Sequence, residues 1–182
     1  MNPGLAAALV LLALTPAAPA RAEPPAAASI AAIVQFNTVC TNCHEGECSA
    51  RLSFDSGAAA AGSHIRRHLG EAPDVHVAAL FAMLRHVKEN CGHYPVVPIR
   101  PAAGAWEAEE LAPWRNPHAG AYFVPPGKLP AGRRQITLEF DGAAAGSARI
   151  DDDRMETIAD ERLCGDAAKI VELDAAADTS YF

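Results

Sequence analysis

The chain has 182 residues, of which 50% are apolar, 6% aromatic and 20% charged, and its formal net charge is −7. This acidity excludes nucleic acid as the main partner, because phosphate binding needs a basic face. The apolar fraction excludes wholesale disorder, and the five cysteines are too few for a disulfide-dense scaffold. The length allows one domain or two small ones.

The first 22 residues have the pattern of a secretory signal peptide. Leu5 to Leu14 form an unbroken apolar run, which is followed by the small–x–small exit Ala20-Arg21-Ala22. The run is shorter than the roughly 20 residues that a membrane-spanning helix needs. We therefore expect residues 1–22 to be removed, leaving a soluble, periplasmic or otherwise exported chain without an integral membrane segment. The alternative is a helix that stays attached as a tether.

Helical patterns dominate the chain as far as Tyr94. Residues 26–39 contain no helix breaker, and their apolar residues can share one broad face. Ser63 is expected to cap a short helix that Gly70 ends. The clearest amphipathic helix spans Asp74 to Lys88, where apolar residues recur at three- and four-residue spacing.

The pattern changes after residue 94. Prolines recur between residues 95 and 130, which disfavours helices, and short strand-like runs follow. These runs are residues 121–124, 134–140, 147–150, 155–158 and 169–173. Asp151 to Asp153 is expected to be an exposed turn. We therefore expect an α+β fold, with an all-α domain over residues 23–95 and a small antiparallel β-sheet or β-sandwich domain over residues 96–182.

One short motif carries chemistry. Cys40-Thr41-Asn42-Cys43-His44 is C-x-x-C-H, the attachment motif of c-type haem. The two thiols lie on one turn, so that each can add to one haem vinyl group, and the imidazole of His44 then reaches the iron as proximal ligand. The motif predicts one haem c, bound covalently through Cys40 and Cys43.

Three other interpretations of the motif compete with haem. The two cysteines could be a thioredoxin-like redox pair, although no βαβ pattern surrounds them. They could be half of a zinc site that Cys48 and a histidine complete. Cys43 and Cys48 could also be ordinary disulfide partners. The adjacent His44, the export signal and the preceding helix favour haem.

Over about residues 26–94 the sequence resembles the class I cytochrome c family. In that family an aromatic residue stands four positions before the first motif cysteine, which Phe36 matches, whereas Ala32 stands where glycine is usual. The resemblance implies an all-α haem domain whose last helix, Asp74 to Lys88, crosses the first at close range. The small residues expected at this crossing are Ala78, Ala79 and Ala82.

The sixth iron ligand is a separate question, because the family's usual methionine before the last helix has no counterpart here. We place His64 first, since it follows a loop-like Gly/Ala stretch that could wrap the haem edge. His68, one helical turn later, is the next candidate. Met83 is a third candidate, although its position suits core packing better. The last alternative is an open or water-filled sixth position.

Charged and histidine side chains near these candidates have simpler interpretations. Arg66 and Arg67 are either partners of the haem propionates or solvent-facing charges. The remaining histidines are expected at the surface or at helix caps. They are His76, His86, His93 and His118.

The cysteines outside the motif are expected to favour pairing in an oxidising compartment. A Cys48–Cys91 bridge would join the motif loop to the end of the last helix, and Cys91–Cys164 is the second possibility. Bulky aromatic residues gather in the part after residue 105. We expect Trp106, Trp114, Tyr122 and Phe123 to form core contacts, or alternatively to provide a docking surface.

These observations predict an exported c-type cytochrome that carries single electrons to and from a periplasmic redox partner protein. We expect no catalytic residue of its own, because the iron supplies the chemistry. Axial ligation by His44 and His64 would give a low reduction potential. The alternatives are a haem-based sensor or small-ligand-binding protein with an open sixth position, and an electron-relay subunit of a periplasmic oxidoreductase.

Overall fold

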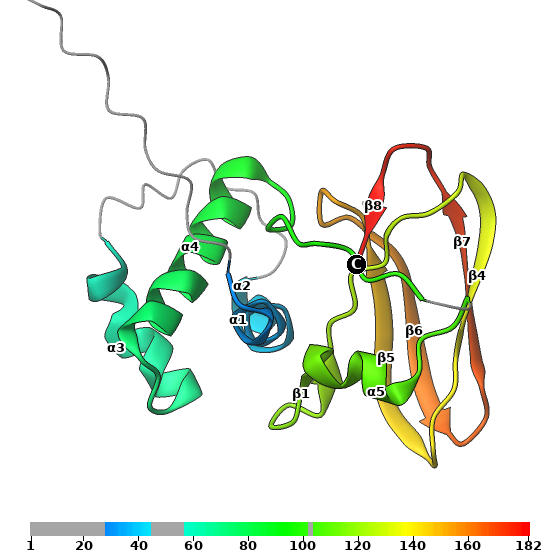
Figure 1. The fold of residues 1–182 in the computed structure, drawn as a ribbon, viewed down its shortest axis with the longest axis horizontal. Helices are drawn as coiled ribbons and strands as arrows, with labels where there is room; N and C mark the ends of the chain where they lie inside the picture. The colour runs from blue at the N-terminus through cyan, green and yellow to red at the C-terminus, as the bar shows by residue number, and fades with distance from the viewer. Residues whose placement is uncertain (1–27, 45–56, 102–103) are drawn as a thin grey trace, which may run out of the picture.

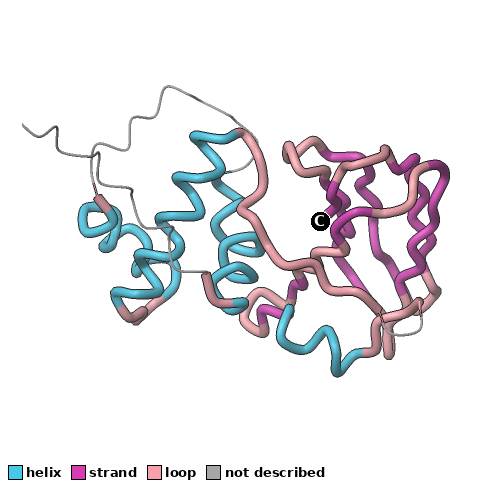
Figure 2. The backbone as a smooth tube through the Cα atoms, turned by 45° about the horizontal axis from the view of Figure 1, so that its top comes forward, coloured by secondary structure: helices cyan, strands magenta, loops and turns pink. Residues whose placement is uncertain are grey.

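The computed structural model describes residues 28–44, 57–101 and 104–182. The expected signal peptide, residues 1–22, lies outside these ranges. Within them, no helix combines the length and the apolarity that crossing a membrane requires. The helices that precede residue 91 occupy one side of the molecule and the long strands the other, while a short helix at residues 108–111 lies on the strand side, as Figures 1 and 2 show.

The first helical segment is continuous and carries the C-x-x-C-H motif. It consists of α1 (Ile30–Gln35), the π-helix η1 (Phe36–Cys40) and α2 (Thr41–His44). The Ser29 side chain caps its start by accepting a hydrogen bond from the Ala32 amide. A helix over most of residues 26–39 is therefore confirmed, but it continues through the whole motif.

Two further helices follow, the second of which packs against this segment. They are α3 (Ala58–Leu69) and α4 (Asp74–Asn90), which contact each other, and α4 also contacts α1 (Figure 1). The expected cap at Ser63 is wrong, because α3 already begins at Ala58 and Ser63 lies inside it. Gly70 ends α3 with a φ of 73°, as expected.

The close crossing of α1 and α4 uses large residues more than small ones. Leu80, Met83 and Val87 are buried there with Ala32, whereas Ala78 is exposed. The expectation that Ala78 lines this crossing is therefore wrong. At 3.6 residues per turn, the large apolar residues of α4 share one face, and Ala78 lies off that face.

The strand region begins with two short helical turns, contrary to the expectation that helices are absent there. They are α5 (Ala108–Leu111) and η2 (Ala112–Trp114). Glu107 and Glu110 form a capping box, which stabilises the first turn. Pro113 fits the second, because proline is tolerated in the first turn of a helix.

All strand pairs of the described region are antiparallel, which confirms the coarse fold class of mixed helix and small antiparallel sheets. The pairs are β1 (Arg115–Asn116) with β2 (Ala121–Tyr122), β3 (Gly127–Lys128) with β8 (Ser180–Tyr181), β4 (Gly132–Leu138) with β7 (Lys169–Ala175), and β5 (Ala144–Asp151) with β6 (Thr157–Gly165). The two long ribbons meet where β6 lies against β7.

Two apolar clusters form the core. The first joins the helices to aromatic residues of the later region and consists of Ala32, Ile33, Val34, Phe36, Leu80, Met83, Val87, Trp114 and Phe123. The second lies among the strands and consists of Ile150, Val171, Leu173, Ala175 and Tyr181. Core contacts of Trp114 and Phe123 are thus confirmed, while Tyr122 is exposed. A domain boundary after residue 95 stays a prediction, and the first cluster extends across it.

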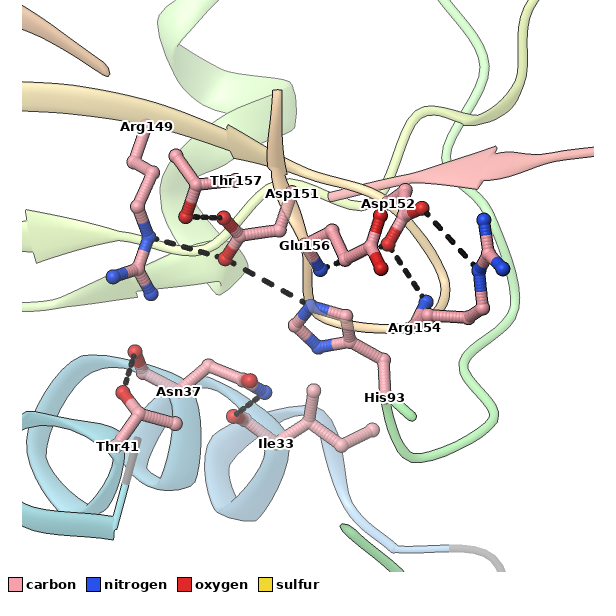
Figure 3. Close-up of polar contacts among 10 residues, drawn as sticks. All are labelled: Ile33, Asn37, Thr41, His93, Arg149, Asp151, Asp152, Arg154, Glu156 and Thr157. Atoms are coloured by element: carbon pink, nitrogen blue, oxygen red, sulfur yellow. Dashed lines mark hydrogen bonds and ion pairs between the residues drawn. The ribbon is translucent and has the colours of Figure 1, made fainter. Parts of the chain in front are cut away.

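Polar groups fill part of the junction between the two regions (Figure 3). Asp151 and Asp152 are buried, so the expected exposed turn is wrong for both. Asp151 accepts a hydrogen bond from Thr157 and faces Arg149 at 3.1 Å. His93, expected at the surface, instead has a buried side chain that stacks on Phe182 at 4.2 Å.

Candidate functional site

The motif residues lie at the end of the first helical segment. Cys40 is half-buried at the last position of η1, while Cys43 is exposed and His44 half-buried on α2. Both cysteines carry free thiols. Helical geometry places Cys40, Cys43 and His44 on neighbouring surfaces of one turn, which is the arrangement that C-x-x-C-H needs.

Side-chain hydrogen bonds hold this segment in its wide π turn. Asn37 donates to the Ile33 carbonyl at 2.9 Å, and Thr41 donates to the Asn37 carbonyl at 2.8 Å (Figure 3). Thr38 donates in the same way to the carbonyl of Val34 at 2.7 Å. Each of these side chains donates to the carbonyl group four residues earlier, a local bond that Asn and Thr side chains form in helices. These bonds stabilise the segment that contains the π turn.

Helix α3 brings its histidines to the motif. The ring centres of His44 and His64 lie 6.1 Å apart, with an angle of 77° between the ring planes. The ring of His68 follows at 4.8 Å from that of His64. The structure therefore brings together the proximal ligand candidate and the first two candidates for the sixth position.

This separation fits a pair of axial imidazoles. An iron–nitrogen bond of about 2 Å, plus about 1.1 Å from a ring nitrogen to the ring centre, places two axial imidazole centres about 6 Å apart. His44 and His64 meet this requirement from two different helices. Cys40 and Cys43 supply the two thiols that attachment consumes. These residue types and this ring separation are compatible with a covalently held haem.

The protonation of the site agrees with ligand chemistry. Burial, followed by the nearby charges of His64, Lys88 and His68, lowers the pKa of His44 below its usual value. The neutral imidazole, which has the lone pair that a metal needs, is therefore the favoured form at neutral pH. Burial, and to a lesser extent Cys43, raises the pKa of the Cys40 thiol to about 11.

Two of the competing interpretations can be compared with this geometry. A thioredoxin-like pair needs one thiol with a lowered pKa, and Cys40 does not supply it, because burial raises its pKa. Among the described residues, no three His, Cys, Asp or Glu side chains converge on a position that could hold a bare metal ion. Cys48, which the zinc interpretation invoked, lies outside the described residues.

The disulfide predictions have mixed outcomes. Cys43 and Cys164 carry free thiols, so the Cys43–Cys48 and Cys91–Cys164 pairings are both wrong. Cys91 itself is disulfide-bonded. Its expected partner, Cys48, is in the part of the chain that the structure does not describe. Cys91 ends α4 in the left-handed conformation, with a φ of 54°.

Met83 does not share the position of the histidines. Its side chain is completely buried in the first apolar cluster, as expected for core packing. Arg66 forms an ion pair with Asp74 and donates to the Ala72 carbonyl, so local contacts account for its charge. His76 is hydrogen-bonded to Gln35, and this bond connects α4 to α1.

Sequence reasoning missed two residues near the motif. Lys88 is buried at the end of α4, close enough for its charge to influence His44. Asn116 is buried in β1 and donates a hydrogen bond to Thr38, 78 residues earlier in the chain. The Asn116-Pro117 pair signals a turn, but no sequence pattern indicates which helix that turn contacts.

Comparisons with protein-family models, with curated proteins and with solved structures find no match for this chain. The functional interpretation of the site therefore depends on its own residues and their geometry.

Proposed function

We propose that this chain is an exported c-type cytochrome that transfers single electrons through one covalently bound haem. The observation that carries the proposal is the 6.1 Å separation of the His44 and His64 rings beside the free thiols of Cys40 and Cys43. One motif thus provides attachment and the proximal ligand, while α3 provides a second imidazole at the distance that iron requires.

Each residue has a defined part in this function. Cys40 and Cys43 would hold the haem covalently through their sulfur atoms, and His44 and His64 would each supply an imidazole nitrogen to its iron. When bound, the haem supplies a metal that alternates between ferric and ferrous states, receiving one electron from a reduced partner and giving it to an oxidised one. The chain holds both ligands on helices, which limits the movement that accompanies each transfer.

Two nitrogen ligands favour ferric iron relative to a nitrogen–thioether pair, so the proposal predicts a low reduction potential. A six-coordinate iron also leaves no position for a substrate, which suits a carrier better than an enzyme. The partners would be redox proteins of the same compartment. Such encounters need little buried area, and no large apolar patch is required.

The competing function is a haem-based sensor or small-ligand-binding protein. It is favoured by one observation, the exposure of His64 on the surface of α3. An exposed ligand is more easily displaced by a small molecule than a packed one, because displacement disturbs fewer contacts. Absorption spectra recorded with and without carbon monoxide distinguish the two functions.

Absorption spectra of the ferric, ferrous and carbon-monoxide-treated protein test the axial pair. The carrier proposal predicts a low-spin, six-coordinate iron that does not bind carbon monoxide readily. His64→Ala should produce a high-spin component and fast carbon monoxide binding, whereas the matched control His68→Ala should keep the wild-type spectra. Ready carbon monoxide binding by the wild type would favour the sensor, and an unchanged His64→Ala spectrum would exclude His64.

Replacing both motif cysteines tests the attachment. Cys40→Ala with Cys43→Ala should leave a chain from which acidic organic solvent extracts all the haem. Cys164→Ala is the control, because it removes a free thiol elsewhere. Haem that stays attached to the double variant would refute the proposed role of the motif.

A further inference from the structure

A turn of the strand region contacts the helical segment just before the motif. Asn116 of β1 is 6% exposed, and its side-chain amide donates to the Thr38 hydroxyl at 2.9 Å. That hydroxyl donates in turn to the Val34 carbonyl at 2.7 Å. Two hydrogen bonds in series therefore link the strand region to the backbone of the first helix.

The hydrogen bonds of Asn116 fix the direction of this link. Its carbonyl oxygen accepts from the backbone amides of His118 and Ala119, at 3.1 and 3.2 Å. Because the oxygen is engaged within its own turn, the amide nitrogen is directed at Thr38. The turn therefore presents a fixed donor, and a buried donor without its acceptor would be costly.

Thr38 is the central residue of the π-helix. Within η1 (Phe36–Cys40), the amide of Thr41 donates to the carbonyl of Phe36, five residues earlier, where an α-helix uses four. A π turn therefore acts as one inserted residue. Because an α-helix advances 3.6 residues per turn, it rotates all later residues by about 100° relative to an uninterrupted helix.

This rotation decides where the motif points. Cys43 and His44 follow the π turn, so their direction depends on whether η1 keeps its register. In the observed register the ring of His44 lies 6.1 Å from that of His64 on α3. An α-helical register would turn His44 away from His64 by about a quarter of a turn or more.

We propose that Asn116 is a positioning residue for the haem motif, which acts through Thr38 to hold the π register and thereby directs His44 towards His64. The part concerning the axial pair rests on the proposed function. The part concerning the register does not, because it concerns the polypeptide alone. The strand region would thus help to set the geometry of a site built entirely on helices.

The test compares Asn116→Ala and Thr38→Val in the full chain, singly and together. One readout is the set of electron paramagnetic resonance g-values of the ferric protein, which depends on the relative orientation of the axial imidazoles. The other is hydrogen exchange of the Thr41 amide, which needs no haem. Each single variant should shift the g-values and speed this exchange roughly tenfold, the order expected when a buried hydrogen bond is lost.

Thr38→Val removes both hydrogen bonds of the series, whereas Asn116→Ala removes only the first, so the double variant should resemble Thr38→Val. Thr38→Ser keeps the hydroxyl and should behave as wild type. Val171→Ala, in the strand cluster, is the control, because it should destabilise the chain without changing the g-values or the Thr41 exchange.

Unchanged g-values and exchange in Asn116→Ala would overturn the inference, as would fully additive effects in the double variant. If Asn116→Ala does not fold, Thr38→Val is compared with Thr38→Ser. Equal g-values and equal Thr41 exchange rates in these two variants would overturn the inference. A wild-type chain without covalent haem would overturn the proposed function instead. The hydrogen-exchange rate of the Thr41 amide would then still test whether Asn116 stabilises the π-helical register.

Discussion

The helical and the strand regions differ in where they keep their polar groups. In the helical region the interior is mainly apolar, and its buried polar residues among those described are Thr41 and Lys88. The candidate ligand His44 is half-buried and His64 is exposed. The strand region buries Asn116, Asp151 and Asp152 at or near its contacts with the helices. The comparison suggests a division of tasks, in which the helices carry the chemistry and the strand region provides fixed contacts that position them.

The apolar cores differ as well. The helical core takes Trp114 and Phe123 from the later part of the chain, whereas the strand core is smaller and draws on strand residues alone. The helical region is therefore not self-sufficient. Substitutions in the two cores should have different consequences for the site.

Trp114→Ala should have the largest effect on stability. Removing a buried aromatic side chain costs about 3–5 kcal/mol, and the lost contacts here belong to the helical core. We expect the helical circular dichroism signal to disappear at a much lower denaturant concentration than in the wild type. If the helices unfold at the wild-type midpoint, the two regions have independent cores and the comparison fails.

Val171→Ala should cost about 2 kcal/mol, because two methyl groups leave a buried position in the strand core. Its effect should be confined to stability, with the absorption spectrum of the haem unchanged. Denaturant unfolding and the spectrum measured on one sample check both points. A changed spectrum would show that the strand core also controls the iron ligands.

His93 should make the junction sensitive to acid. Burial is the largest influence on its pKa and lowers it, while Asp151, Asp152 and Asp153 act in the opposite direction. Among the described residues the Nε2 atom of His93 has no hydrogen-bond partner, and it lies 3.9 Å from Asp151, which also faces Arg149. The folded state therefore disfavours the protonated imidazole.

The sign of the pH effect follows from linkage. Below about pH 6.5 the unfolded chain binds a proton at His93 more readily than the folded chain, so stability falls as the pH falls, by at most about 1.4 kcal/mol per pH unit. His93→Gln should reduce this slope whatever its effect at neutral pH. Unfolding measured between pH 5 and 8 tests this, and an equal slope in both proteins would contradict it.

Exposed ion pairs should contribute least in both regions. Arg85–Glu89 on α4 and Lys128–Asp178 between strands are largely solvated, so Arg85→Ala and Lys128→Ala should each cost about 0.5 kcal/mol or less. Thermal unfolding at low and high salt checks this. A larger loss in one region would show that its surface charges contribute to its stability.

Local patterns predicted much of the fold. The three- and four-residue spacing in α4 and the alternation in β4 each specify which face is buried, so both elements were found. The π turn was missed, because no sequence pattern indicates it, and the contact of Asn116 with Thr38 was missed, because tertiary packing sets it. The burial of His93 and Asp151 was also missed, because tertiary packing sets it and polar residues such as these are seldom fully buried.

The candidate site was predictable only in part. The C-x-x-C-H spacing identifies Cys40, Cys43 and His44 directly, because its chemistry is local. His64 was a choice among alternatives, and its distance from His44 became available only with the packing of α3. The influence of Lys88 on His44 had no sequence signal, because it joins the end of α4 to α2.

The most direct test of the central claim is the mass of the denatured chain, purified from a host that exports proteins and attaches c-type haem. The account predicts that the chain carries the added mass of one haem, and that this mass is lost when Cys40 and Cys43 are both replaced by alanine. A wild-type chain with no added haem would contradict it.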